Sequence, residues 1–207
     1  MPIVKHIEAQ AVEQDERSRP RDLAGLVAEL GDANPTARRW AARDLAQHAD
    51  AAKTLAAQLE HESDPAVREA IFMSLTEIGD SVAVQGLMKF LRSEDAAIRN
   101  EAIDAMKNLP DVVAPFMTGL LTDADADVRI LALNILESLR HPDVEKWLLD
   151  VIRNDPHVNV CATAVDLLGE VGSEAALMPL ENLKQRFPNE PYIAFASDLA
   201  LKRIRED

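Results

Sequence analysis

Apolar residues recur along most of this chain at the three-, four- and seven-residue spacings of amphipathic helices. Within residues 67–78, Val67, Ile71 and Leu75 fall on one helical face. A second apolar run precedes such a helix, as at residues 82–91 and 112–121. The pattern therefore predicts an all-α fold built from paired helices.

A short turn motif repeats at almost constant spacing. Each copy ends in an arginine, and these arginines are Arg38, Arg68, Arg99 and Arg129. Four residues earlier stands an Asp or Asn, a residue type that caps helix N-termini by accepting hydrogen bonds from free backbone N–H groups. Pro35 and Pro65 follow the cap at the first helical position, where a missing N–H costs nothing. Each unit is thus predicted to be a helix, a tight turn and a second helix.

The motif weakens toward the C-terminus. A fifth copy begins at Asp155-Pro156, and a sixth is expected at residues 189–193. The fifth copy has no arginine, and two registers are possible: one puts Cys161 at the arginine position and the other puts Asn159 there. The regular series therefore ends at the fourth unit.

The second unit of the series resembles a known repeat. Residues 64–68, Asp-Pro-Ala-Val-Arg, followed by Leu75, Ile78 and Gly79-Asp80, resemble the HEAT-like repeat of the type found in phycobilisome lyases. The resemblance spans about residues 22–205 and implies an α-solenoid of about six helical hairpins whose second helices line a concave face. We expect residues 22–207 to form a single HEAT-like repeat domain, and residues 1–21 an N-terminal cap or flexible segment.

The same resemblance implies a structural role for the turn residues. The Asp and Arg side chains are expected to bond between neighbouring turns and to fix the stacking, with a basic binding stripe as the lesser alternative. This expected turn ladder consists of Asp64, Arg68, Asp95, Arg99, Asp125 and Arg129.

Charge and composition narrow the possible functions. The 207 residues carry a formal net charge of −14, which opposes binding to nucleic-acid phosphates. The single cysteine fits a reducing compartment, and no apolar run is long enough to span a membrane. The polar N-terminus has no signal-peptide core. We therefore expect a cytoplasmic protein with neither nucleic acid nor membrane as its partner.

Catalytic and metal-binding patterns are missing from the sequence. No two histidines have the spacing that places two ligands on one helix face, and no Gly-rich phosphate loop or Cys-x-x-Cys is present. Residues 123–127 begin like a calcium loop but have Val128 and Asn134 where it needs Gly and Glu. Cys161 and Trp147 are predicted to be structural. The sequence predicts no catalytic residue, metal or cofactor.

Side chains outside the apolar face that each second helix turns to the predicted core indicate a binding surface. Trp40, Met73 and Leu131 are large apolar groups at such positions, and Glu77, Glu101 and Asp104 are acidic ones; all six are candidate partner-binding residues. Residues 94–127 carry eight acidic and two basic side chains. These features predict a noncatalytic scaffold or adaptor whose concave face binds a protein or peptide, preferably a basic one.

Alternatives remain at this point. Residues 4–14 are a candidate cover for Trp40, and the acidic stretch is either groove or outer wall. The whole chain is alternatively a lyase-like or maturation accessory of a cofactor-bearing protein, or a purely structural subunit of a larger complex. The sequence leaves the partner, the oligomeric state and the role of the sixth unit open.

Overall fold

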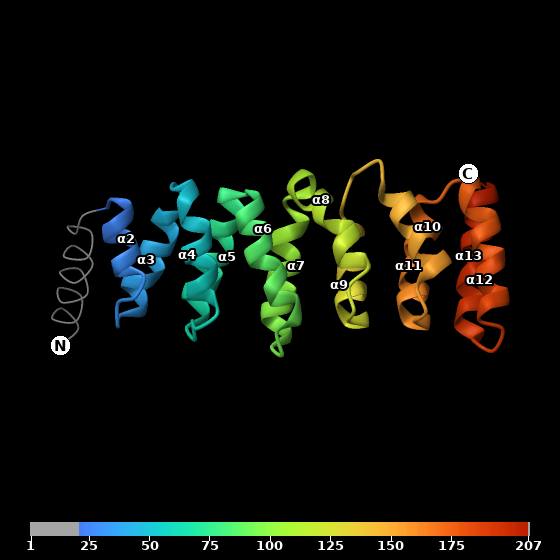
Figure 1. Cartoon of the computed structure of the whole chain (residues 1–207), viewed down its shortest axis with the longest axis horizontal. Helices are drawn as coiled ribbons and strands as arrows, with labels where there is room; N and C mark the ends of the chain where they lie inside the picture. The colour runs from blue at the N-terminus through green and yellow to red at the C-terminus, as the bar shows by residue number, and fades with distance from the viewer. Residues whose placement is uncertain (1–20, 207) are drawn as a thin grey trace, which may run out of the picture. The chain divides into compact units, whose positions relative to one another are not determined.

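The computed structural model describes residues 21–206, and over this range the protein consists of twelve α-helices and three short 3₁₀ segments (Figure 1). The expectation of an all-α solenoid is confirmed. The expected N-terminal cap, residues 1–21, lies outside the described residues except for Arg21. The chain forms two compact units, Met1–Phe90 and Leu91–Asp207, which are treated separately below.

The described part of the first unit contains five helices. They are α2 (Leu23–Glu29), α3 (Pro35–Leu45), α4 (Ala52–Leu59), α5 (Pro65–Ile78) and α6 (Ser81–Met88). α2 packs on α3, α3 on α5, and α4 on both α5 and α6. Leu45 on α3 and Ile71 and Leu75 on α5 are fully buried in the core of this unit, as the helical periodicity predicts.

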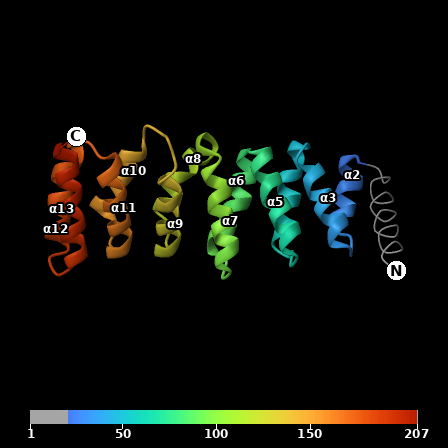
Figure 2. The same ribbon diagram turned by 180° about the vertical axis from the view of Figure 1, so that it is seen from behind.

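The described part of the second unit, residues 91–206, contains seven α-helices. They are α7 (Ala96–Lys107), α8 (Pro110–Leu121), α9 (Ala126–Leu136), α10 (Val144–Asn154), α11 (Val158–Val171), α12 (Leu177–Arg186) and α13 (Pro191–Glu206). The second helices α7, α9, α11 and α13 follow one another in contact, and so do the first helices α8, α10 and α12 (Figure 2). Met106, Leu133 and Leu148 are among the side chains that fill this core.

Capping explains where the second helices begin. The Asp64 carboxylate accepts hydrogen bonds from the backbone N–H groups of Ala66 and Val67 at the start of α5. Asn34, Asp95 and Asp125 cap α3, α7 and α9 in the same way. At the other end of α5, Gly79 adopts a left-handed conformation (φ 56°) that terminates the helix.

The structure resolves the open register of the fifth repeat. α11 begins at Val158 with His157 at the capping position, so Cys161 occupies the place of the arginine. Asp155 then stands two residues before the cap. The sixth repeat is a complete hairpin, α12 and α13.

Between residues 21 and 206, no helix combines the length and the apolar character needed to cross a membrane.

Candidate functional site

The second helices can be aligned from their first residues, and equivalent positions then show which side of each helix faces solvent. Counting from the first helical residue, the ninth residue of each second helix is at least partly exposed. We call these side chains the ninth-position row. In the first unit the row consists of Arg43 and Met73, and in the second unit of Asp104, Asn134, Asp166 and Leu199.

In the second unit, this row changes from polar to apolar at α13. Tyr192, Phe195 and Leu199 are 53%, 65% and 40% exposed, and their spacing places them along one side of the helix. The corresponding residues of α11 are Asn159, Ala162 and Asp166. We call Tyr192, Phe195 and Leu199 the α13 apolar face.

A hydrogen bond joins the α13 apolar face to its polar neighbour. The Tyr192 hydroxyl contacts the Asp166 carboxylate oxygens at 2.9 and 3.1 Å, donating its proton to the carboxylate. This hydrogen bond raises the pKa of Tyr192 above its usual value, because losing the proton would put two negative charges side by side. The contact shows that the acidic and apolar portions are contiguous.

The predicted candidates of the second unit lie on this same side but differ in exposure. Asp104 is exposed on α7. Glu101 and Leu131 are the sixth residues of α7 and α9 and are only half-buried, closer to the helix–helix contact. The acidic stretch 94–127 is not one surface, because Asp111 lies on the first helix α8 and Asp123 in the turn after it.

The predicted candidates of the first unit have a different chemical environment. Trp40 is half-buried, and the guanidinium carbons of Arg39 and Arg43 lie 5.8 and 5.5 Å from its ring centroid. Met73 is 59% exposed. Glu77 accepts a 2.7 Å hydrogen bond from the Gln47 side chain. The segment expected to cover Trp40, residues 4–14, lies outside the described residues.

Arg38, Arg99 and Arg129 bind carbonyl groups of their own turns, and Arg38 and Arg129 also bind a carboxylate of the following turn. Arg129 contacts both Asp155 carboxylate oxygens at 2.6 and 3.0 Å, and also the backbone oxygens of Asp123 and Ala124. Arg38 contacts Glu62 in the same two-pronged way, at 2.8 and 2.7 Å. These pairs are largely shielded from water, and Arg38 lowers the Glu62 pKa to about 2.

The remaining ladder candidates have other partners. Arg99 donates to the backbone oxygens of its own turn, at Ser93 and Glu94. The aspartates Asp64, Asp95 and Asp125 use their carboxylates to cap their own helices. The carboxylates that receive Arg38 and Arg129 stand two residues before the next helix cap, a recurrence of acids at Asp32, Glu62, Asp123 and Asp155 that is visible in the sequence.

Arg186 occupies the turn where the arginine is missing. From the end of α12 it donates to the backbone oxygens of Ile152, Arg153 and Asp155, and its side chain lies 3.1 Å from the Cys161 sulfur. Cys161 is fully buried, and burial raises its thiol pKa to about 11. Burial and the raised pKa both disfavour the reactive thiolate at this position.

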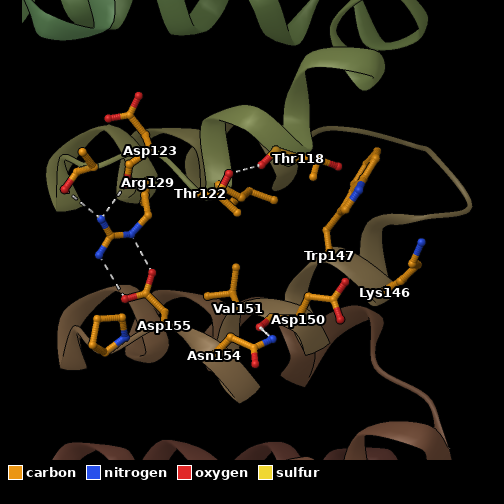
Figure 3. A pocket seen from close by; sticks show the side chains of 13 residues that line it. Thr118, Thr122, Asp123, Arg129, Lys146, Trp147, Asp150, Val151, Asn154 and Asp155 are labelled. Atoms are coloured by element: carbon orange, nitrogen blue, oxygen red, sulfur yellow. Dashed lines mark hydrogen bonds and ion pairs between the residues drawn. The ribbon is translucent and has the colours of Figure 1, made fainter.

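The second unit also contains a pocket of about 690 Å³ that sequence reasoning missed. It lies among α8, the turn after it and α10, on the first-helix side. Figure 3 shows Trp147 at one end, Arg129 and Asp155 at the other, and Thr122 and Val151 on facing sides between them. Trp147 is 8% exposed. No sequence motif marks this pocket, because its walls come from three separate segments.

Comparisons with known proteins identify the repeat. The family model described as HEAT repeats matches residues 23–107 and 113–192. No curated protein matches the chain.

Solved structures show similarity at low identity. The archaeal HEAT-like repeats protein from Thermococcus onnurineus NA1 is 18% identical, with a TM-score of 0.46 over 96% of this chain and 92% of that one. The complex of CpcE and CpcF of phycocyanin lyase from Nostoc sp. PCC7120 is 18% identical, with a TM-score of 0.37 over 87% and 94%. Computationally designed armadillo repeat proteins for modular peptide recognition are 17% identical, with a TM-score of 0.44 over 88% and 99%.

Proposed function

The chain belongs to the HEAT-repeat family, and from this premise we propose that it is a noncatalytic scaffold that binds a basic, partly apolar polypeptide segment on the exposed side of its second helices. One observation carries the proposal: the α13 apolar face contacts Asp166 on α11 and stands in the same helical register as Asp104 on α7.

The α13 apolar face supplies the hydrophobic part of the binding surface. Two aromatic side chains and a leucine lie exposed on one helix side, although α13 buries Ile193, Ala196 and Leu201 against α11 and α12. Exposed aromatic and aliphatic groups that lie together are typical of protein contacts, since their removal from water drives association. A partner with leucine or aromatic residues fits this face.

The acidic part of the surface supplies charge selectivity. Asp104, Asp166 and Glu170 are exposed and form no ion pair with any other residue in the range 21–206. Their uncompensated negative charge favours a partner that carries Lys or Arg, and it accelerates association at low salt. Glu101 is half-buried on the same helix as Asp104.

We place two predicted residues of the first unit in a second binding patch. Met73 offers an exposed, flexible apolar side chain, and Glu77 lies one turn further along the same helix side. Trp40 contributes less apolar area to such a patch, because two arginines flank its ring. Leu131 lies at the edge of the second-unit surface on α9.

The experiment is a selection of random peptides, displayed on phage, against the immobilised full chain. We expect the selected peptides to combine Lys or Arg with leucine or aromatic residues, and to bind more weakly as salt increases. The double variant Asp104→Asn/Asp166→Asn should weaken binding by about 3- to 30-fold and flatten the salt dependence.

The matched control is Asp50→Asn/Asp111→Asn, which removes the same charge from exposed positions on first-helix segments. It should leave the affinity within about twofold. Selected peptides without basic residues, or equal losses in the two double variants, would show that the acidic row does not select the partner.

A further inference from the structure

The pocket between α8 and α10 has the dimensions of a small-molecule site. Its volume of about 690 Å³ falls within the range of roughly 300–1,000 Å³ that is usual for ligand pockets. Leu121, Val151 and Pro156 give it an apolar lining. It belongs to the first-helix side of the second unit, so it is separate from the proposed polypeptide surface on the second helices.

The charges at the inner end of this pocket compensate one another. Arg129 is paired with Asp155, and Asp123 is paired with Arg92 at 2.5 Å. Lys146 and Asp150 are exposed and opposite in sign, and Figure 3 shows Lys146 beyond the Trp147 ring, at the outer edge. Lys146 forms no ion pair with any residue in the range 21–206, but it is exposed to water at this outer edge. Deeper in the pocket, a charged occupant would meet only Arg129 and Asp155, which neutralise each other, so the arrangement favours a neutral occupant.

Trp147 offers a flat aromatic surface at one end. The His141 imidazole stacks on the indole with ring centroids 5.0 Å apart and an interplanar angle of 18°, and His141 does not line the pocket. This stacking holds the indole in place from outside the pocket. A planar ring inside the pocket gains both apolar burial and offset or edge contact with the indole.

Thr122 offers a hydrogen-bond acceptor along the wall. Its hydroxyl donates to the Thr118 backbone oxygen at 2.8 Å, so its proton is engaged and its oxygen lone pairs are directed elsewhere. The Thr118 hydroxyl is exposed at the same wall and hydrogen-bonds to no residue within 21–206. An occupant that carries an O–H or N–H donor is therefore favoured over a hydrocarbon.

We propose that this pocket binds a neutral, planar aromatic group that carries a hydrogen-bond donor, as a phenol does. The ring lies between Leu121 and Val151 with Trp147 at its end, and the donor bonds to the Thr122 hydroxyl oxygen. Free phenolic compounds and a tyrosine side chain share this chemistry, and the two sources are separated by experiment below.

The test is a titration of the full-length protein with p-cresol, followed by the indole N–H signal of Trp147 in ¹H–¹⁵N NMR spectra. We expect a saturable shift with a Kd of about 0.1–10 mM, as befits so small a ligand. The Trp40 indole signal, assigned with a Trp40→Phe variant, should not move. Toluene, which has the same ring but no donor, should bind at least about threefold more weakly.

Two variants test the contacts. Thr122→Val should weaken p-cresol binding by about 3- to 10-fold and leave toluene unchanged. Thr163→Val is the matched control, because the Thr163 hydroxyl also donates to the backbone oxygen four residues earlier but lies outside the pocket. Ala124→Phe, at an exposed position on the pocket wall, should abolish binding of both ligands by filling the space.

N-acetyl-L-tyrosinamide distinguishes the two sources. If it binds as p-cresol does, a tyrosine of a polypeptide fits the pocket; if only p-cresol binds, the natural occupant is a free small molecule. Absence of any saturable Trp147 shift with p-cresol would overturn the proposal, and so would equal affinities for p-cresol and toluene that Thr122→Val leaves unchanged.

Discussion

The turn arginines have unequal roles, which only the side-chain geometry reveals. Arg38 and Arg129 reach a carboxylate of the following turn, whereas Arg99 donates to the backbone oxygens of Ser93 and Glu94 in its own turn. A buried ion pair is costly to break from one side, because the remaining charge loses its partner without regaining water. The arginines that look equivalent in the sequence should therefore differ in their contribution to stability.

Replacing Arg129 by Ala should lower the free energy of unfolding by about 3–5 kcal/mol, since it leaves Asp155 buried and the carbonyls of the turn without their donor. Urea denaturation of the native protein and of Arg129→Ala measures this loss. Arg153→Ala is the control, because Arg153 is exposed and its ion pair with Asp150 is long, at 3.9 Å. It should change the free energy of unfolding by less than about 0.5 kcal/mol. A loss below about 1 kcal/mol for Arg129→Ala would contradict the structural role.

Glu62 should give the first unit a specific acid sensitivity. Its pKa is lowered from 4.5 to about 2, chiefly by the hydrogen bonds from Arg38. A carboxylate with a depressed pKa stabilises the fold above its unfolded pKa and loses this contribution as the pH falls through the folded value. The native protein should therefore have a larger free energy of unfolding than Glu62→Gln at neutral pH. This difference, the stability gap, should shrink to zero as the pH falls from about 4.5 to about 2.

The expected size of that gap at neutral pH is about 2–3 kcal/mol. Urea denaturation at several pH values measures it, with the exposed Glu137→Gln as the control. A gap that stays constant with pH would show that the Arg38–Glu62 pair does not titrate as described.

Cys161 takes the place of the arginine in its turn, and the Arg186 guanidinium from α12 binds the backbone oxygens there. The native thiol should resist a disulfide reagent at pH 8, because it is buried and its pKa is raised to about 11. Arg186→Ala should make the thiol react at least about tenfold faster, since it removes the side chain that closes this turn. Equal reaction rates in the two proteins would contradict this role for Arg186.

At the level of helices, two glycines provide a paired test of packing. A Cβ at Gly86 on α6 would lie 2.7 Å from the Ala56 Cβ on α4, whereas a Cβ at Gly119 on α8 would meet nothing within 4 Å. Gly86→Ala should therefore destabilise the protein by about 1–3 kcal/mol through overpacking. Gly119→Ala should stabilise it by about 0.5–1 kcal/mol through helix propensity. Thermal unfolding measures both, and shifts of the same sign would contradict the packing described.

Helix positions were predictable from the sequence because caps and periodicity act locally. The Asp64-Pro65 start of α5 and its Gly79 end coincide with the turn motif. The register of α11 was not predictable, because Asp155 looks like a cap although it lies two residues before the true one, His157. The pocket beside Trp147 escaped prediction since it depends on how closely α8 and α10 approach, which is a tertiary property.

At the level of the whole chain, the acidic side chains have three different roles. Glu62 and Asp155 are buried in ion pairs, several aspartates cap helices, and others such as Asp104 and Asp166 face solvent. The sequence predicted Glu77, Glu101 and Asp104 as binding acids but did not point to Asp166, because spacing alone does not separate capping acids from exposed ones. The α13 apolar face was missed as well, since the sixth repeat departs from the turn motif.

The most direct measurement of the proposed scaffold function is the affinity of a selected peptide for Phe195→Ala/Leu199→Ala, compared by calorimetry with the native chain and with Met178→Ala. Met178 is 70% exposed on the first helix α12 and serves as the matched apolar control. We expect the double variant to weaken binding more than about tenfold and Met178→Ala to leave it unchanged. Unchanged binding in the double variant, with the helical fold retained, would contradict the claim that the α13 apolar face binds the partner.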